Sequence, residues 1–177
     1  PTQALLDMYS ILERKGKLEG LKVEICGDVM HSRVARSDIY GMQKMGIDVH
    51  LAGPRTLVYP EMEKMGVTVH HDIREALEGA DVVNVLRIQL ERINSALYPT
   101  NREYARIFGI NSEVLKAAKP DVMVMHPGPM NRGLEISHDV AYSEESVIQE
   151  QVRNGVAIRM AVLYLTINGG DGSEIAD

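Results

Sequence analysis

The chain has 177 residues, of which 45% are hydrophobic and 25% charged, and its formal net charge is −6. This length suffices for one well-buried domain without disulfides or a structural metal, and the acidic balance disfavours nucleic acids and anionic membranes as partners. The single cysteine, Cys26, excludes an internal disulfide, and no apolar run approaches the ~20 residues of a membrane span, so a cytoplasmic location is expected.

Short apolar runs that alternate with helical patterns dominate the chain. The predicted strands are residues 21–27, 46–53, 66–71, 80–87 and 120–128. They are almost continuously apolar, which is typical of strands covered on both faces. The alternation predicts an α/β fold: a doubly wound, mostly parallel five-stranded sheet with helices on both faces (Rossmann-like), in one domain over residues 1–177.

The helical patterns carry recognisable start and stop signals. The predicted helices cover residues 2–16, 32–45, 60–65, 72–79, 111–119 and 143–167. Ser32, Asp72 and Ser112 stand near helix starts, whereas Gly46, Gly66 and Gly79 stand near helix ends. The many apolar residues of the last helix indicate that it packs against more than one neighbour.

Residues 88–111 interrupt this alternation with charges and aromatics that follow no clean period. A long polar connection after a strand of a parallel sheet is usually a lid or a substrate loop. The alternative is an ordinary helix with a connector.

The stretch CGDVMHSRVARSD places Arg33 in the first turn of a helix that follows a strand. Free backbone amides and this guanidinium suit a carboxylate or a phosphate. The stretch lacks the glycines of a dinucleotide fingerprint. The alternative is that Arg33 is a solvated helix charge.

The stretch VVNVLRIQLER ends a strongly apolar strand on Arg87, which needs a partner if it is buried. Arg87 and Gln89 share a face if the extended geometry continues, and a guanidinium beside an amide suits a second carboxylate. A surface salt bridge for Arg87 is the alternative. Arg92 is either a further ligand group or an internal salt-bridge partner, and the salt bridge is the expectation.

The stretch MHPGPMNRG brackets Gly128 with two prolines just after a strand. A rigid loop of this kind exposes backbone carbonyls that accept hydrogen bonds from an amide or an amine, and one X-Pro bond in it is expected to be cis. His126 either titrates near neutral pH or is a hydrogen-bonded structural residue.

Several common chemistries are disfavoured by the sequence. His70 and His71 lack the helical spacing of a zinc site and are expected to end a strand. The serines lack a G-x-S-x-G context, and no Walker loop is present. No nucleophile is evident, so the three stretches together offer two arginines for two carboxylates and carbonyls for an NH2 group.

PTQALLD, GDVMHSRVARS, LRIQLER and MHPGPMNRGLEI together resemble the carboxyl-terminal, aspartate-binding domain of the aspartate carbamoyltransferases. The resemblance covers essentially the whole chain. The related ornithine enzymes carry HCLP and SMG motifs where this chain has HPGP and RIQLER, so aspartate is the expected amino acid.

The resemblance implies roles for six residues. Arg33 would hold the α-carboxylate of aspartate, and Arg87 with Gln89 the β-carboxylate. Gln3 and the carbonyls of Gly128 and Pro129 would contact the carbamoyl NH2 group, and Gly128–Pro129 would be the cis bond. Residues 94–109 would close on aspartate, and no cofactor, metal ion or catalytic side chain of this chain would be needed.

The resemblance also implies that the amino-terminal, carbamoyl-phosphate domain is absent from this chain, which would be inactive alone. Part of an apolar face on the first helix, formed by Leu5, Leu6, Tyr9 and Leu12, would then be exposed. The full-length enzyme would be a homotrimer, with or without regulatory or dihydroorotase chains. A non-catalytic amino-acid-binding module and a carbamoyltransferase for another amino acid are the alternatives.

Overall fold

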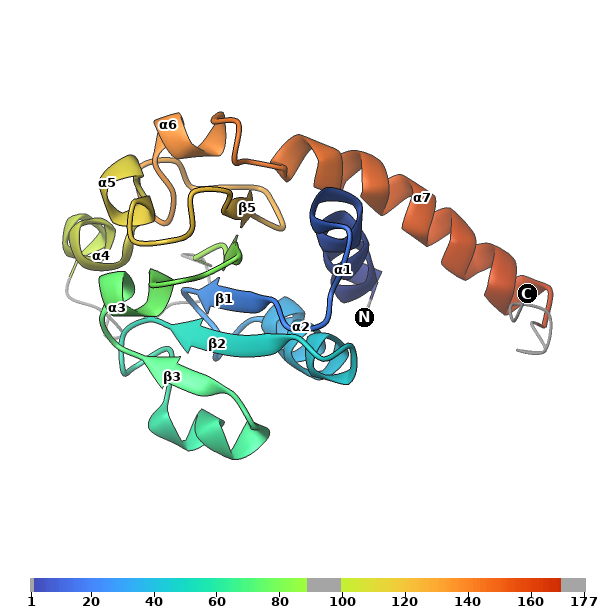
Figure 1. Ribbon diagram of the computed structural model, residues 1–177, viewed down its shortest axis with the longest axis horizontal. Coiled ribbons are helices and arrows are strands. Elements are labelled where there is room, and N and C mark those ends of the chain that lie inside the picture. Colours follow the sequence, from blue (N-terminus) through green and yellow to red (C-terminus); the bar gives the residue numbers. More distant parts are fainter. Residues whose placement is uncertain (1, 89–99, 170–177) are drawn as a thin grey trace.

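The computed structural model describes residues 2–88 and 100–169, which form a layered α/β domain with one long helix extending from it (Figure 1). The strands are β1 (Lys22–Cys26), β2 (Asp48–Ala52), β3 (Thr68–His70), β4 (Val82–Val85) and β5 (Met123–Met125). The helices are α1 (Thr2–Lys15), α2 (Arg33–Lys44), α3 (Ile73–Leu77), α4 (Asn101–Phe108), α5 (Ser112–Leu115), α6 (His138–Ala141) and α7 (Ile148–Ile167), with a 3-10 helix, η1, at Pro60–Met65.

The five strands form one sheet in the order β3-β2-β1-β4-β5, and every pairing in it is parallel. The predicted fold class is therefore confirmed, and each strand lies inside its predicted range. The sheet is wholly rather than mostly parallel.

Side chains alternate between two hydrophobic cores along the strands, because successive residues of a strand point to opposite faces. On β1, Val23 and Ile25 belong to the core beneath α1 and α2, whereas Cys26 belongs to the core beneath α3 and α5. Helices therefore cover both faces of the sheet, as the apolar strands predict.

The helix caps match most of the expected signals. Ser32 accepts a hydrogen bond from the Ala35 amide, and Asp72 accepts bonds from two amides of α3. At α5 the capping residue is Asn111 rather than Ser112, because the Asn111 side chain accepts bonds from the amides of Glu113 and Val114. The segment at 60–65 is a 3-10 helix, which suits so short a stretch with proline at its first position.

Part of the apolar face of α1 is exposed, as expected, and Leu6 is its buried member. Leu5, Tyr9 and Leu12 are 43%, 42% and 45% exposed, but Leu6 is 2% exposed. Helix α7 covers Leu6 at Gly155, where an added Cβ would lie 3.3 Å from Leu6 Cδ2.

The interrupting segment contains a helix as well as a connection. Residues 101–108 form α4, whose Tyr104 is buried against Ile88 and Leu134. The expected closing loop at 94–109 is thus helical in its described second half, whereas its first half, Gln89 and Arg92 lie outside the described residues.

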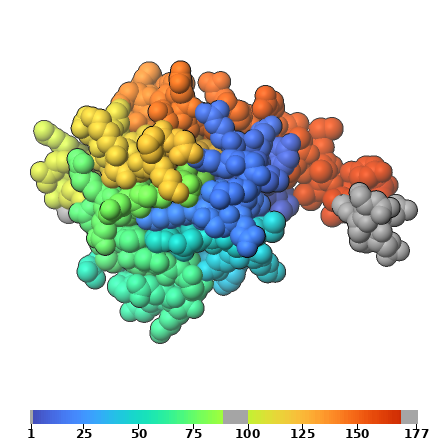
Figure 2. Space-filling model, viewed as in Figure 1, coloured from blue at the N-terminus to red at the C-terminus, as the bar shows by residue number. Residues whose placement is uncertain are grey.

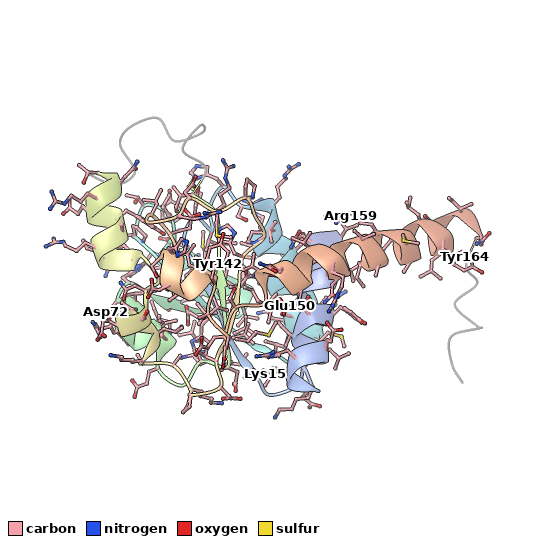
Figure 3. All side chains as sticks on the ribbon, turned by 90° about the horizontal axis from the view of Figure 1, so that it is seen from above. Lys15, Asp72, Tyr142, Glu150, Arg159 and Tyr164 are labelled. Atoms are coloured by element: carbon pink, nitrogen blue, oxygen red, sulfur yellow. The ribbon has the colours of Figure 1, made fainter. Side chains whose placement is uncertain are left out.

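Helix α7 packs against the domain through its first half only. Gln151 and Asn154 are buried against α1, whereas the second half carries exposed apolar side chains and extends beyond the body of the molecule (Figure 2). Glu150 lies where the helix joins the body and Tyr164 lies on the extension (Figure 3). The first half of α7 also contacts β5 and the loop after it, so the helix has the second neighbour that its sequence predicts. In that part of the chain no helix, α7 included, combines the length and apolar character that a membrane crossing requires.

Candidate active site

The sheet changes winding direction between β1 and β4. The chain runs outward from β1 through β2 to β3 on one side, and from β4 to β5 on the other. Cys26 at the end of β1 pairs with Val85 at the end of β4, and the Leu86 amide donates to the Cys26 carbonyl at 2.8 Å. Open parallel sheets bind ligands outside the carboxyl ends of their strands at such a switch point.

Arg33 lies directly after this point on the β1 side. It is the first residue of α2, follows the capping Ser32, and is exposed. The turn between β1 and α2 contains Asp28, which is buried and accepts hydrogen bonds from the His31 amide at 3.2 Å and from His31 Nδ1 at 2.8 Å. This pair, which sequence reasoning did not single out, fixes the turn that presents Arg33.

Gly27 allows the segments that follow β1 and β4 to run close together. Its φ is +120°, and a Cβ added there would lie 3.3 Å from the Leu86 carbonyl oxygen. A side chain at this position would strain the backbone and crowd the residue that precedes Arg87.

Arg87 lies two residues beyond the end of β4 and is half-buried. The structure therefore brings the residue positions of Arg33 and Arg87 to the same edge of the sheet, after adjacent strands. Convergence of their side chains on one ligand remains a prediction, and Gln89 lies outside the described residues.

Gln3 and Gly128 line one pocket of about 220 Å3, formed by α1, α7 and the loop after β5. His126, Pro127 and Gln151 line the same pocket. The Gly128–Pro129 bond is cis, as predicted, and both of its residues are exposed. Two of the groups predicted to contact the carbamoyl NH2 group therefore face one cavity, although their roles remain predictions.

A buried hydrogen-bond network holds the residues that line this pocket. It favours the interpretation of His126 as a hydrogen-bonded structural residue. The Gly128 amide donates to His126 Nδ1 at 2.9 Å, so that nitrogen is an acceptor. The hydrogen then lies on Nε2, 3.1 Å from Glu135 Oε1. His126 is therefore held between the loop, through Nδ1, and a buried carboxylate, through Nε2.

Asn131 connects the loop after β5 to the segment that carries Arg87. Its side-chain amide donates to the Ile88 carbonyl at 2.9 Å and to Glu135 Oε2 at 3.2 Å. Its backbone amide donates to Glu135 Oε1 at 2.5 Å. The positions of Gly128 and of the residue after Arg87 are thus set by the same carboxylate.

The network continues through Gln151 to the start of α1. Gln151 Oε1 accepts from the His126 amide at 2.9 Å, and its Nε2 donates to Asp7 Oδ1 at 2.8 Å. Gln3 Nε2 donates to the same oxygen at 2.9 Å, one helical turn away. Burial raises the pKa of Asp7 to about 6, although the hydrogen bonds from Gln151 and Gln3 oppose the shift.

Sequence reasoning missed Asp7, Glu135 and Gln151. The four-residue spacing between Gln3 and Asp7 on one helix face was the available signal. Nothing in the sequence indicates that Gln151 lies beside His126, since that contact depends on how α7 crosses α1.

The family model for the aspartate/ornithine carbamoyltransferase Asp/Orn binding domain matches residues 19–166. The chain belongs to this family. The aspartate carbamoyltransferase catalytic subunit of Heliobacterium modesticaldum is 64% identical over 173 residues, which are 98% of this chain and 55% of that protein. The corresponding subunit of Desulforamulus reducens is 60% identical over 96% of this chain and 54% of its own length.

Solved structures of the same family share the fold. Ornithine carbamoyltransferase from Pyrococcus furiosus matches with a TM-score of 0.79 and 32% identity, over 93% of this chain and 55% of that one. Aspartate transcarbamoylase from Trypanosoma cruzi in complex with carbamoyl phosphate matches with a TM-score of 0.80 and 29% identity over the same shares. The chain thus spans about half the length of the relatives it matches.

Proposed function

We propose that this chain is the aspartate-binding half of an aspartate carbamoyltransferase, an enzyme of pyrimidine biosynthesis that transfers a carbamoyl group from carbamoyl phosphate to the amine of L-aspartate. The observation that carries the proposal is the 64% identity to a catalytic subunit of that name along 98% of the chain.

In this proposal Arg33 holds the α-carboxylate of aspartate, and Arg87 with Gln89 holds the β-carboxylate. Their positions after β1 and β4, at the switch point of the sheet, support this assignment. Guanidinium groups suit carboxylates because they donate paired hydrogen bonds. Arg87 would also repel the cationic side chain of ornithine, which favours aspartate.

Gln3 and the carbonyls of Gly128 and Pro129 hold the carbamoyl NH2 group in the same proposal. The pocket shared by Gln3 and Gly128 supports it. The aspartate amine attacks the carbamoyl carbon, a C–N bond forms, the C–O bond to phosphate breaks, and the amine loses a proton. Positioning of two substrates and stabilisation of developing charge then supply the rate enhancement, without a nucleophilic side chain.

The remaining parts of the proposal concern the whole enzyme. An amino-terminal domain would bind the phosphate group, and the complete enzyme would be a cytoplasmic homotrimer with or without regulatory or dihydroorotase chains. The coverage of only 55% of the relatives supports a second domain. The exposed apolar side chains Leu5, Tyr9 and Leu12 on α1 offer it a surface.

The test supplies the chain with the amino-terminal domain of a close relative and measures carbamoyl-aspartate formation from carbamoyl phosphate. We expect product with aspartate, none with ornithine, and none from either domain alone. Absence of product from a pair that associates, while aspartate still binds, would favour the non-catalytic binding module. Product with another amino acid instead would identify a different carbamoyltransferase.

A further inference from the structure

Three side chains that the carbamoyl-transfer site does not use meet on the α3 face of the sheet. Glu24 on β1 and His50 on β2 are register partners, and His70 lies on β3 at the edge. One potential ligand atom from each residue lies within 4.8 Å of the other two. His70 was set aside in the sequence because it has no helical partner, but the parallel register supplies two partners from neighbouring strands.

The two histidines turn one nitrogen toward each other and the other toward a carboxylate. His50 Nδ1 lies 3.0 Å from His70 Nε2, and the rings stack with their centroids 5.3 Å apart. His50 Nε2 lies 3.0 Å from Asp48 Oδ2, and His70 Nδ1 lies 3.7 Å from Glu75 Oε1. Carboxylates at these positions favour hydrogens on the outer nitrogens and lone pairs on the inner ones, the arrangement that metal-binding histidines adopt.

Glu24 is the least satisfied group of the cluster. Its side chain is fully buried, and neither carboxylate oxygen has a hydrogen-bond partner within residues 2–88 and 100–169. Lys22 extends from the same face, but its Nζ donates to the carbonyls of Ala76 and Glu78 at 2.9 and 2.7 Å. A buried carboxylate without a partner is costly, and burial accordingly raises the pKa of Glu24 well above its usual range.

A hydrogen bond between His50 and His70 explains the contact of the two rings but leaves both oxygens of Glu24 unsatisfied. A cation between the three groups satisfies all of them. Two imidazole nitrogens and one carboxylate oxygen suit Zn2+ or a similar transition-metal ion, whereas Mg2+ and Ca2+ favour sites made of oxygen ligands. The histidine side chains are 13% and 12% exposed, which leaves a path to solvent and room for water as a fourth ligand.

We propose that Glu24, His50 and His70 form a binding site for a divalent transition-metal ion of the Zn2+ type. The ion links β1, β2 and the edge strand β3, so its principal effect is to stabilise this side of the sheet. The site is independent of carbamoyl transfer, since none of its residues is among those assigned to the substrates.

The test uses the 177-residue chain after treatment with a chelator. Co2+ is titrated in and followed by its visible absorption, which reports the geometry of nitrogen and oxygen ligands, and Zn2+ is then added as a competitor. We expect one equivalent of Co2+ per chain, displacement by Zn2+ but not by Mg2+, and a rise in Tm with Zn2+. Glu24→Gln and His50→Gln are each expected to weaken binding at least tenfold and to abolish the rise in Tm.

His71→Gln is the matched control, because His71 neighbours the cluster but directs its Nδ1 to the Gly53 carbonyl at 2.9 Å. It is expected to bind Co2+ like the unchanged protein. Circular dichroism verifies that each variant is folded. Absence of a bound equivalent, or binding that Glu24→Gln and His50→Gln leave intact, would overturn the proposal. If His50→Gln lowers the stability but the unchanged protein binds no metal, the proposal is also wrong, and the contact of His50 with His70 is only a hydrogen bond.

Discussion

At the residue scale, the carboxylate of Glu135 has a larger structural role than its position in a loop suggests. It is 1% exposed and accepts from His126 Nε2 and from both amide groups of Asn131. These bonds fix the loop that presents Gly128 and join it to the carbonyl of Ile88. A carboxylate that satisfies several buried donors positions the candidate pocket without contacting substrate.

Glu135→Ala is expected to lower the free energy of unfolding by about 3 kcal/mol, because several buried donors lose their acceptor. Urea denaturation of the chain measures the change. Glu144→Ala, at an exposed position between α6 and α7, is the control. It should change the free energy of unfolding by less than about 0.5 kcal/mol. Equal effects of the two substitutions would remove the structural role assigned to this network.

Asp7 and Asp38 are two buried carboxyls whose charges interact, which makes stability depend on pH. Burial raises the pKa of both carboxyls, and the charge of Asp7 adds to the shift at Asp38, whereas the hydrogen bond from Asn84 opposes it. The folded state therefore binds protons more tightly than the unfolded state. For Asp7 the stabilisation is complete below pH 3.8 and is lost as the pH rises toward about 6.

Asp7→Asn is expected to remove this contribution, which is of the order of 3 kcal/mol across the interval. The asparagine carbonyl can still accept the bonds from Gln3 and Gln151. Unfolding free energies of the two proteins are compared at pH 4, 5, 6 and 7, and the variant should gain stability relative to the unchanged chain as the pH rises. A difference that is constant over this range would show that Asp7 does not titrate there.

At the scale of elements, the strands were the most predictable part of the fold. All five lie within their predicted ranges, because strands covered on both faces appear as short, almost unbroken apolar runs. The two edge strands, β3 and β5, are the least accurate, with three residues observed in each against predictions of six and nine residues. An edge strand has one neighbour only, so its length depends on pairing that the sequence does not show.

The helices were harder to predict where their burial depends on other elements. Leu6 belongs to the amphipathic pattern of α1, yet it is buried because α7 crosses at Gly155. Helix α4 was predicted only as the alternative to a loop, because its charges and aromatics follow no clean period, although Thr100 caps it by accepting from the Glu103 amide.

The residues of the candidate site also differ in how well the sequence predicts them. Arg87 and the HPGP loop follow strands closely, and Arg33 begins the helix after β1, so strand prediction places all three at the carboxyl edge of the sheet. The supporting residues Asp7, Glu135 and Gln151 and the cluster of Glu24, His50 and His70 depend on register and helix crossing. Such contacts between distant segments are not encoded in local patterns.

At the scale of the whole molecule, the second half of α7 is a large apolar surface. Met160, Leu163, Tyr164 and Ile167 are each at least 59% exposed. Contiguous exposed apolar surfaces of this kind usually mark an interface. Under the proposed function, the amino-terminal domain is the partner that covers it.

Met160→Glu combined with Leu163→Glu is expected to weaken association with an amino-terminal domain by at least tenfold. The free energy of unfolding of the chain alone should change by less than about 0.5 kcal/mol, since both side chains are already in water. Calorimetric titration of one domain into the other measures the affinity. Tyr40→Glu on α2, another exposed apolar position, is the control and should bind normally. If the double variant also binds normally, α7 is not the interface.

The main proposal is that the guanidinium groups of Arg33, in the first turn of α2, and of Arg87, after the end of β4, hold the two carboxylates of one ligand. Calorimetric titration of succinate, which has both carboxylates and no amine to react, tests it most directly in the chain reconstituted with an amino-terminal domain and carbamoyl phosphate. We predict that Arg33→Leu and Arg87→Leu each weaken succinate binding at least tenfold, or by about 1.4 kcal/mol, whereas the exposed Arg36→Leu has no effect. Unchanged succinate affinity in either of the first two variants would contradict the claim.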